Sequence, residues 1–136
     1  MTIIIKEIKA MSRLDDSLVY KHSGYNCCQA VLMAFKDKLG LDDEVLAQLG
    51  SGFGNGMGCM EGTCGALCGA AAAAGLMNNG IPTTMITKQL LAKFKNDCGS
   101  TICKDLKGIG TGKVLCSCDD CVTNATKALV EVMGIE

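Results

Sequence analysis

The sequence has few of the residues that catalytic and nucleic-acid-binding sites commonly use. Its 136 residues include no tryptophan, one histidine, one proline and five aromatic side chains. A cysteine protease needs a histidine beside its nucleophile, so the single His22 gives that class little support. Thirteen basic residues balance fourteen acidic ones. With so few aromatic rings to stack on bases, we expect no nucleic-acid partner.

Long apolar runs are also missing. The chain reaches the charged pair Lys6-Glu7 after three isoleucines, whereas a secretory signal has about 7–15 apolar residues. The uncharged stretch 62–87 is interrupted by Asn78-Asn79-Gly80-Ile81-Pro82, so its apolar part is shorter than the ~20 residues of a membrane span. We therefore expect a cytoplasmic protein that does not insert into membranes.

The glycine-rich segments do not match nucleotide-binding motifs. Gly54-Asn55-Gly56 has no third glycine in the dinucleotide register and no preceding strand, and Gly112-Lys113-Val114 lacks the hydroxyl residue and the leading glycine of a P-loop. Alternate glycines over 50–58 exclude a regular helix there. This segment either lets backbone pass close to a cofactor or a neighbouring helix, with amides that donate to sulfur, or is a flexible loop.

Cysteine, in contrast, is abundant, with ten residues in the chain. A domain of this length buries roughly 68% of the surface of its unfolded chain, so it can form a core without disulfide bridges. In a reducing compartment many thiols indicate metal binding or redox chemistry. The cysteine positions are therefore the main evidence on function.

Apolar side chains recur at helical spacing through most of the chain, most clearly over 26–39. Further helices are predicted over 12–22, 42–49, 64–77, 83–96 and 121–133, with a single turn around Cys103. Only Thr2–Ile5 could be a strand. The sequence predicts one all-α domain over residues 1–136. We expect a compact bundle of about five or six helices, with a glycine-rich loop before a central alanine-rich helix.

Four cysteines are predicted to lie in the first turn of a helix, each near a capping residue: Cys27, Cys64, Cys103 and Cys121. Free backbone N–H groups and the positive end of the helix dipole favour a thiolate, the form that binds metals and attacks disulfides. If the four helix starts converge, they form a tetrathiolate site. Cys28 and Cys68 lie on apolar stripes, where we expect small core side chains.

Local cysteine spacings leave alternatives open. Cys118 and Cys121 form a C-x-x-C pair, but no βαβ pattern accompanies it, which disfavours a thioredoxin site. Cys118 remains a candidate resolving thiol. The spacing of Cys59, Cys64 and Cys68 differs by one residue from the plant-type ferredoxin pattern. Paired zinc knuckles are absent, the four favoured cysteines are far apart in sequence, and His22 is not placed among them.

Four short segments share an order of cysteines and glycines with a known family: Gly24-Tyr-Asn-Cys-Cys-Gln-Ala-Val31, Cys64-Gly-Ala-Leu-Cys-Gly69, Cys103-Lys-Asp-Leu106 and Cys121-Val122. They give the chain from Gly24 to Met133 a resemblance to the C_GCAxxG_C_C family, to which redox activity is ascribed. It implies that Cys27, Cys64, Cys103 and Cys121 are the family's signature cysteines. A more distant likeness to the C-terminal region of split-Soret cytochromes implies an iron–sulfur centre. The sequence departs from the signature by six extra cysteines: Cys28, Cys59, Cys68, Cys98, Cys116 and Cys118.

These observations predict a small redox protein in which Cys27, Cys64, Cys103 and Cys121 bind an Fe–S cluster for electron transfer or redox sensing. One alternative is a metal-free thiol oxidoreductase that uses the same cysteines, with Cys118 and Cys121 as the local pair. Another is a protein that binds soft metals such as zinc or copper. The redox partner and the presence of a homo-oligomer stay open.

Overall fold

The computed structural model describes residues 2–79 and 81–136, and residues 2–10 by their backbone alone. Within these ranges the protein is all-α, with nine helical segments and no strand, which confirms the predicted class. The segments are α1 (Thr2–Lys21), α2 (Cys27–Ala34), α3 (Lys36–Leu39), α4 (Asp43–Gly50), η1 (Gly56–Met60), α5 (Gly65–Met77), α6 (Thr84–Cys98), α7 (Cys103–Lys107) and α8 (Cys118–Met133). None of the described helices combines the length and apolar character that a membrane crossing requires.

Two predicted boundaries near the N-terminus were wrong. Helix α1 begins at Thr2 rather than near Ser12, so the strand considered at Thr2–Ile5 is helical. Isoleucines at positions 4 and 8 continue the spacing of a helix and favour this extension. The helix predicted over 26–39 is divided into α2 and α3, because Phe35 leaves the helical conformation (φ −111°, ψ 11°).

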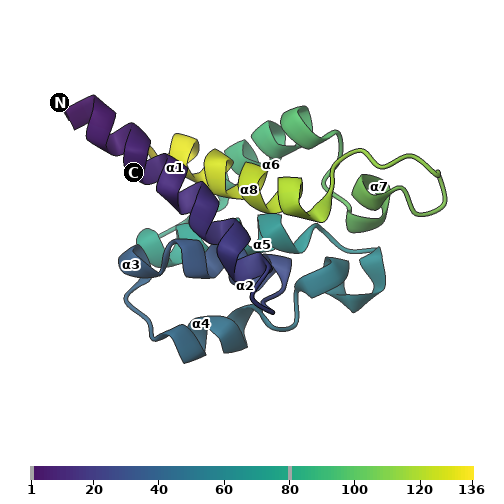
Figure 1. Cartoon of the computed structure of the whole chain (residues 1–136), viewed down its shortest axis with the longest axis horizontal. Helices are drawn as coiled ribbons and strands as arrows, with labels where there is room; N and C mark the ends of the chain where they lie inside the picture. Colours follow the sequence, from purple (N-terminus) through teal and green to yellow (C-terminus); the bar gives the residue numbers. More distant parts are fainter. Residues whose placement is uncertain (1, 80) are drawn as a thin grey trace.

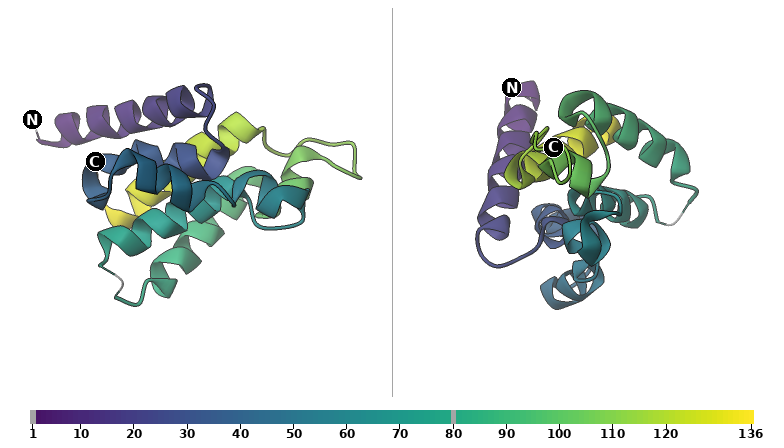
Figure 2. Two further views of the ribbon diagram at one scale, coloured as in Figure 1. Left: turned by 90° about the horizontal axis from the view of Figure 1, so that it is seen from below. Right: turned by 90° about the vertical axis from the view of Figure 1, so that its right-hand side faces the viewer.

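Helices α2, α5 and α8 contact one another and form the centre of the bundle. Helix α1 packs on α2 and α8, α4 on α2, and α6 on α5 and α8 (Figures 1 and 2). The small side chains of α5 allow the close approach that the sequence predicted: a Cβ added at Gly69 would lie 2.6 Å from the carbonyl oxygen of Cys28 in α2. The core therefore has no room for a larger residue at this crossing.

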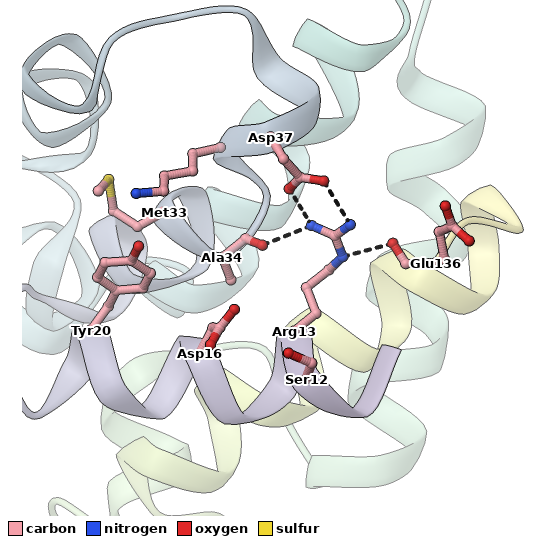
Figure 3. A pocket seen from close by; sticks show the side chains of 9 residues that line it. Ser12, Arg13, Asp16, Tyr20, Met33, Ala34, Asp37 and Glu136 are labelled. Atoms are coloured by element: carbon pink, nitrogen blue, oxygen red, sulfur yellow. Dashed lines mark hydrogen bonds and ion pairs between the residues drawn. The ribbon is translucent and has the colours of Figure 1, made fainter. Parts of the chain in front are cut away.

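The buried side chain of an arginine in α1 joins this helix to the C-terminal end of α2. The guanidinium of Arg13 donates to both carboxylate oxygens of Asp37 (2.6 and 3.1 Å), to the carbonyl oxygen of Ala34 (2.8 Å) and to that of Glu136 (2.7 Å) (Figure 3). It also lies 4.9 Å from the centre of the Phe35 ring. These bonds hold the pKa of Asp37 below its usual range. The cavity beside them, about 280 Å³, is thus lined by an arginine that already binds protein groups.

Candidate functional site: a pocket of cysteine thiols

Five cysteines line one small pocket, called here the cysteine pocket. Its walls are formed by Cys27, Cys64, Gly65, Cys103, Leu106, Lys107, Cys118 and Cys121. Figure 1 shows the first turns of α5 and α8 on the side of the bundle where α7 lies. The enclosed volume is about 10 Å³, close to what one water molecule needs. The structure thus brings together the four cysteines predicted at helix starts and Cys118, which the sequence named as a candidate resolving thiol.

The first wall is the start of α2, which a capping box fixes. The Asn26 side chain accepts a bond from the Gln29 backbone N–H, and the Gln29 side chain accepts one from Asn26 N–H, both at 2.8 Å. The Asn26 amide also donates to the carbonyl oxygens of Gly50 and Ser51 at 3.2 Å, which fastens α2 to the end of α4. Cys27, the first residue of α2, is therefore held in a defined orientation.

A short backbone pairing places Cys64 beside Cys103. Thr63 and Ile102 form an isolated antiparallel bridge. Around it, Cys64 N–H donates to Thr101 O (2.8 Å) and Cys103 N–H donates to Gly62 O (3.1 Å). Cys64 is the N-cap of α5, a position predicted for Thr63, and Cys103 is the first residue of α7. Two helix starts far apart in sequence are thus joined by main-chain bonds.

Helix α8 starts earlier than predicted and contributes two thiols. Ser117 is its N-cap, and its hydroxyl accepts a bond from Asp120 N–H at 3.1 Å. Cys118 and Cys121 then both lie in the first turn, three residues apart, and this spacing places them on the same side of the helix. From the sequence, Cys121 is expected at the helix start and Cys118 outside the helix.

Two glycines leave room for the sulfur atoms. A Cβ at Gly65 would lie 2.4 Å from the Cys27 sulfur, and one at Gly56 would lie 2.4 Å from the Cβ of Cys103. Gly56 also has a φ of +55°, in a segment where Asn55 and Met57 adopt left-handed conformations without being glycine. The glycine-rich run and the glycine after Cys64 therefore bring backbone close to two pocket cysteines, as one of the two sequence interpretations expected.

The thiols interact in pairs, and the pairing sets their pKa values. The Cys118 thiol bonds to the Cys27 sulfur and, against the effect of burial, lowers the pKa of Cys27 to about 6, with help from the backbone of Asn55 and from Lys107. The Cys121 thiol likewise lowers the pKa of Cys64, which the backbone amides of Leu67 and Ala66 lower further. Two thiolates are thus each stabilised by a neighbouring thiol.

The helix-start positions predict a low pKa for all four cysteines. For Cys121 and Cys103 this prediction is wrong. Bonding to Cys64 raises the pKa of Cys121, because the proton stays on Cys121 as donor. Burial raises the pKa of Cys103, and nearby Lys107 offsets this only in part. Burial also opposes the charge of Lys107, but electrostatic interaction with the Cys118 and Cys103 sulfurs raises its pKa overall. The helix terminus makes one contribution to the pKa of each cysteine, but the neighbouring groups determine whether that pKa rises or falls.

The spacing of the sulfur atoms distinguishes kinds of metal centre. Zinc–thiolate bonds of about 2.3 Å place the ligand sulfurs roughly 3.8 Å apart. Among the described residues, the one group of three ligand atoms that all lie within 4.8 Å of one another is Cys98, Cys116 and Cys121. No three of the five pocket cysteines meet this condition. Their thiols are thus spread more widely than one tetrahedral ion requires, whereas a polynuclear cluster accepts thiolates on separate metal atoms.

The remaining cysteines and the histidine lie outside the pocket. Cys28 is buried in the core, where burial raises its pKa to about 12, and Cys68 packs against the core, as the sequence predicted. Cys59 is exposed on η1. The imidazole of His22 is also exposed and bonds to the Asp119 carboxylate at 2.8 Å. Cys98 lies at the end of α6 and Cys116 in the loop before α8. No spacing motif joins these two segments, so the sequence predicts no role for either cysteine.

One of three comparisons with known proteins identifies a family. Neither the curated proteins nor the solved structures include a significant match to the chain. A family model with the description "Putative redox-active protein (C_GCAxxG_C_C)" matches residues 25–132, a range that contains all five cysteines of the pocket. The match covers most of the sequence, so the chain belongs to the C_GCAxxG_C_C family.

Proposed function

We propose that the protein is a redox carrier or sensor whose cysteine pocket holds an Fe–S cluster through Cys27, Cys64, Cys103 and Cys121. The observation that carries the proposal is the convergence of these four thiols from four helix starts on one pocket. Fe–S clusters are bound by four cysteine thiolates. Among the described residues, no three pocket sulfurs lie within 4.8 Å of one another, which favours a cluster over a single ion.

The surroundings also suit a cluster. Its ligands are thiolates, and the Cys27 and Cys64 sulfurs have lowered pKa values. The Lys107 ammonium lies at the pocket and offsets negative charge. Backbone amides beside sulfur and exclusion of water tune the potential of such centres. When bound, the cluster would supply one-electron chemistry.

The test is anaerobic reconstitution of the full chain with iron and sulfide. We expect visible absorbance, bound iron and acid-labile sulfide, and an electron paramagnetic resonance signal in one oxidation state. Serine variants of Cys27, Cys64, Cys103 and Cys121 should each lose iron. Cys59→Ser is the matched control, because Cys59 is exposed and outside the pocket. A colourless, iron-free protein, or equal iron loss in Cys59→Ser, contradicts the proposal.

A second function, thiol–disulfide exchange, is favoured by the paired thiols. Cys27 interacts with Cys118 and Cys64 with Cys121, and these pairs are alternatives to the local Cys118–Cys121 pair expected from sequence. Oxidation of the first pair would form one S–S bond and release two protons and two electrons to a disulfide oxidant, itself reduced to two thiols. Mass spectrometry of trapped thiols in iron-free protein should show this two-proton difference and a Cys27–Cys118 crosslink. Unchanged mass after incubation with oxidised glutathione excludes it.

A further inference from the structure

A second group of thiols lies next to the cysteine pocket. The sulfur atoms of Cys98, Cys116 and Cys121 all lie within 4.8 Å of one another, and all three residues are buried. Three thiolates around one zinc-sized ion are separated by about 3.8–4 Å. Small rotations of the side chains are therefore enough to bring the three sulfurs onto one ion.

We propose that Cys98, Cys116 and Cys121 form a separate binding site for a thiophilic divalent cation such as Zn²⁺. A site of three thiolates has a net charge of −1 with a divalent ion bound and −2 with a monovalent ion bound. Burial penalises the larger net charge, which favours the divalent ion. Cys98 is the last residue of the fifteen-residue helix α6. The negative end of its helix dipole favours a cation there.

A side-chain amide donates hydrogen bonds to two of the three sulfur atoms. Asn124, on α8 one turn beyond Cys121, donates through Nδ2 to the sulfur of Cys98 at 3.3 Å and to that of Cys116 at 3.9 Å. Donors of this kind stabilise thiolates and orient metal ligands. Asn124 is therefore a positioning residue for the proposed ion.

The ion would connect to the cysteine pocket in two ways. Cys98 and Cys116 enclose the segment 99–115, which carries Cys103 and Lys107, and a metal that closes such a loop restricts the unfolded chain. Cys121 belongs to both groups of thiols. Because the proposed cluster also uses Cys121, the ion and the cluster would compete for this sulfur. This link to the pocket rests on the proposed function, but the ion site itself does not.

The experiment titrates reduced, iron-free, full-length protein with Cd²⁺, a zinc analogue with an ultraviolet sulfur-to-metal absorption band. We expect one tight equivalent whose ¹¹³Cd resonance indicates three thiolates, and displacement of Cd²⁺ by Zn²⁺. The double variant Cys98→Ser/Cys116→Ser should lose this binding. The matched double variant Cys27→Ser/Cys103→Ser, which also removes two buried thiols, should retain it. Asn124→Ala should weaken binding roughly 10- to 100-fold.

Three results would overturn the proposal: unchanged Cd²⁺ binding in Cys98→Ser/Cys116→Ser, loss of binding only in Cys27→Ser/Cys103→Ser, or displacement by Cu(I) but not by Zn²⁺. If the first variant does not fold, alkylation of the wild type decides instead. Cd²⁺ should protect Cys98 and Cys116, and equal labelling with and without Cd²⁺ refutes the site. No iron is present in these assays, so a failure to bind an Fe–S cluster leaves their outcome unaffected.

Discussion

Replacing Gly65 by alanine tests whether this glycine makes room for the Cys27 sulfur. The new Cβ would lie 2.4 Å from that sulfur and 2.7 Å from the carbonyl oxygen of Phe53. Ordinary contact begins near 3.4 Å, so the sulfur must move by about 1 Å and the carbonyl by somewhat less. Because the carbonyl is backbone, the sulfur is the group that can yield, and the pocket changes shape.

The energetic cost follows from two opposing effects. Overpacking of this kind costs about 1–3 kcal/mol, and the gain in helix propensity is at most about 1 kcal/mol because Gly65 is the first residue of α5. We expect the free energy of unfolding to fall by about 1–2 kcal/mol. Gly75→Ala is the matched control, since its Cβ meets nothing within 4 Å in the same helix. That variant should be stabilised by up to about 1 kcal/mol.

Urea denaturation monitored by circular dichroism measures both stabilities, and iron content after reconstitution measures the site. Gly69→Ala separates the two effects, because its Cβ would meet the Cys28 carbonyl oxygen at 2.6 Å in the core rather than a pocket sulfur. Folded Gly69→Ala should retain iron, while folded Gly65→Ala should lose it. If Gly65→Ala matches Gly75→Ala in stability and binds iron normally, the steric account of the cysteine pocket is refuted.

Three further predictions concern the capping box, the thiol pair and the buried arginine. Asn26→Ala should reduce unfolding free energy by about 0.5–2 kcal/mol, while Asn96→Ala on exposed α6 surface should change it little; equal effects would contradict the capping role. In iron-free protein, ultraviolet thiolate absorbance should show a step near pH 6, because the pKa of Cys27 is about 6 and that of Cys28 about 12. Cys27→Ser should remove this step and Cys28→Ser should leave it. Persistence of the step in Cys27→Ser refutes the assignment. Arg13→Lys should lower unfolding free energy by about 1–3 kcal/mol in urea, because lysine cannot keep the two-pronged bond, and an unchanged midpoint would contradict this.

Helix content was predictable because it depends on local patterns. Apolar spacing identified every long helix, and the Asn26 cap marked the start of α2 within one residue. The boundaries were less predictable where local signals conflict. Phe35 follows the apolar stripe yet ends α2, and Ser12 resembles a cap although α1 runs through it. In both cases the helix limits depend on packing that no local pattern contains.

The pocket was predictable from a physical rule combined with the motif. Cysteine at a helix start faces free amides, and helix starts point toward shared sites when helices converge. The rule selected four of the five pocket cysteines. The rule did not select Cys118, which only the C-x-x-C spacing singled out, because the cap of α8 is Ser117, four residues before the predicted start at Cys121, so two thiols share the first turn.

The sequence could not predict the group of Cys98, Cys116 and Cys121, for a different reason. Cys98 ends a helix and Cys116 lies in a loop, so neither has the helix-start position that marked the other cysteines. Their proximity comes from the packing of α6 on α8 and from the two bonds by which the backbone N–H groups of Leu115 and Cys116 reach the Leu106 carbonyl oxygen. These bonds return the chain from α7 toward the start of α8. Contacts of this long-range kind depend on the whole fold, and a spacing motif in the sequence cannot report them.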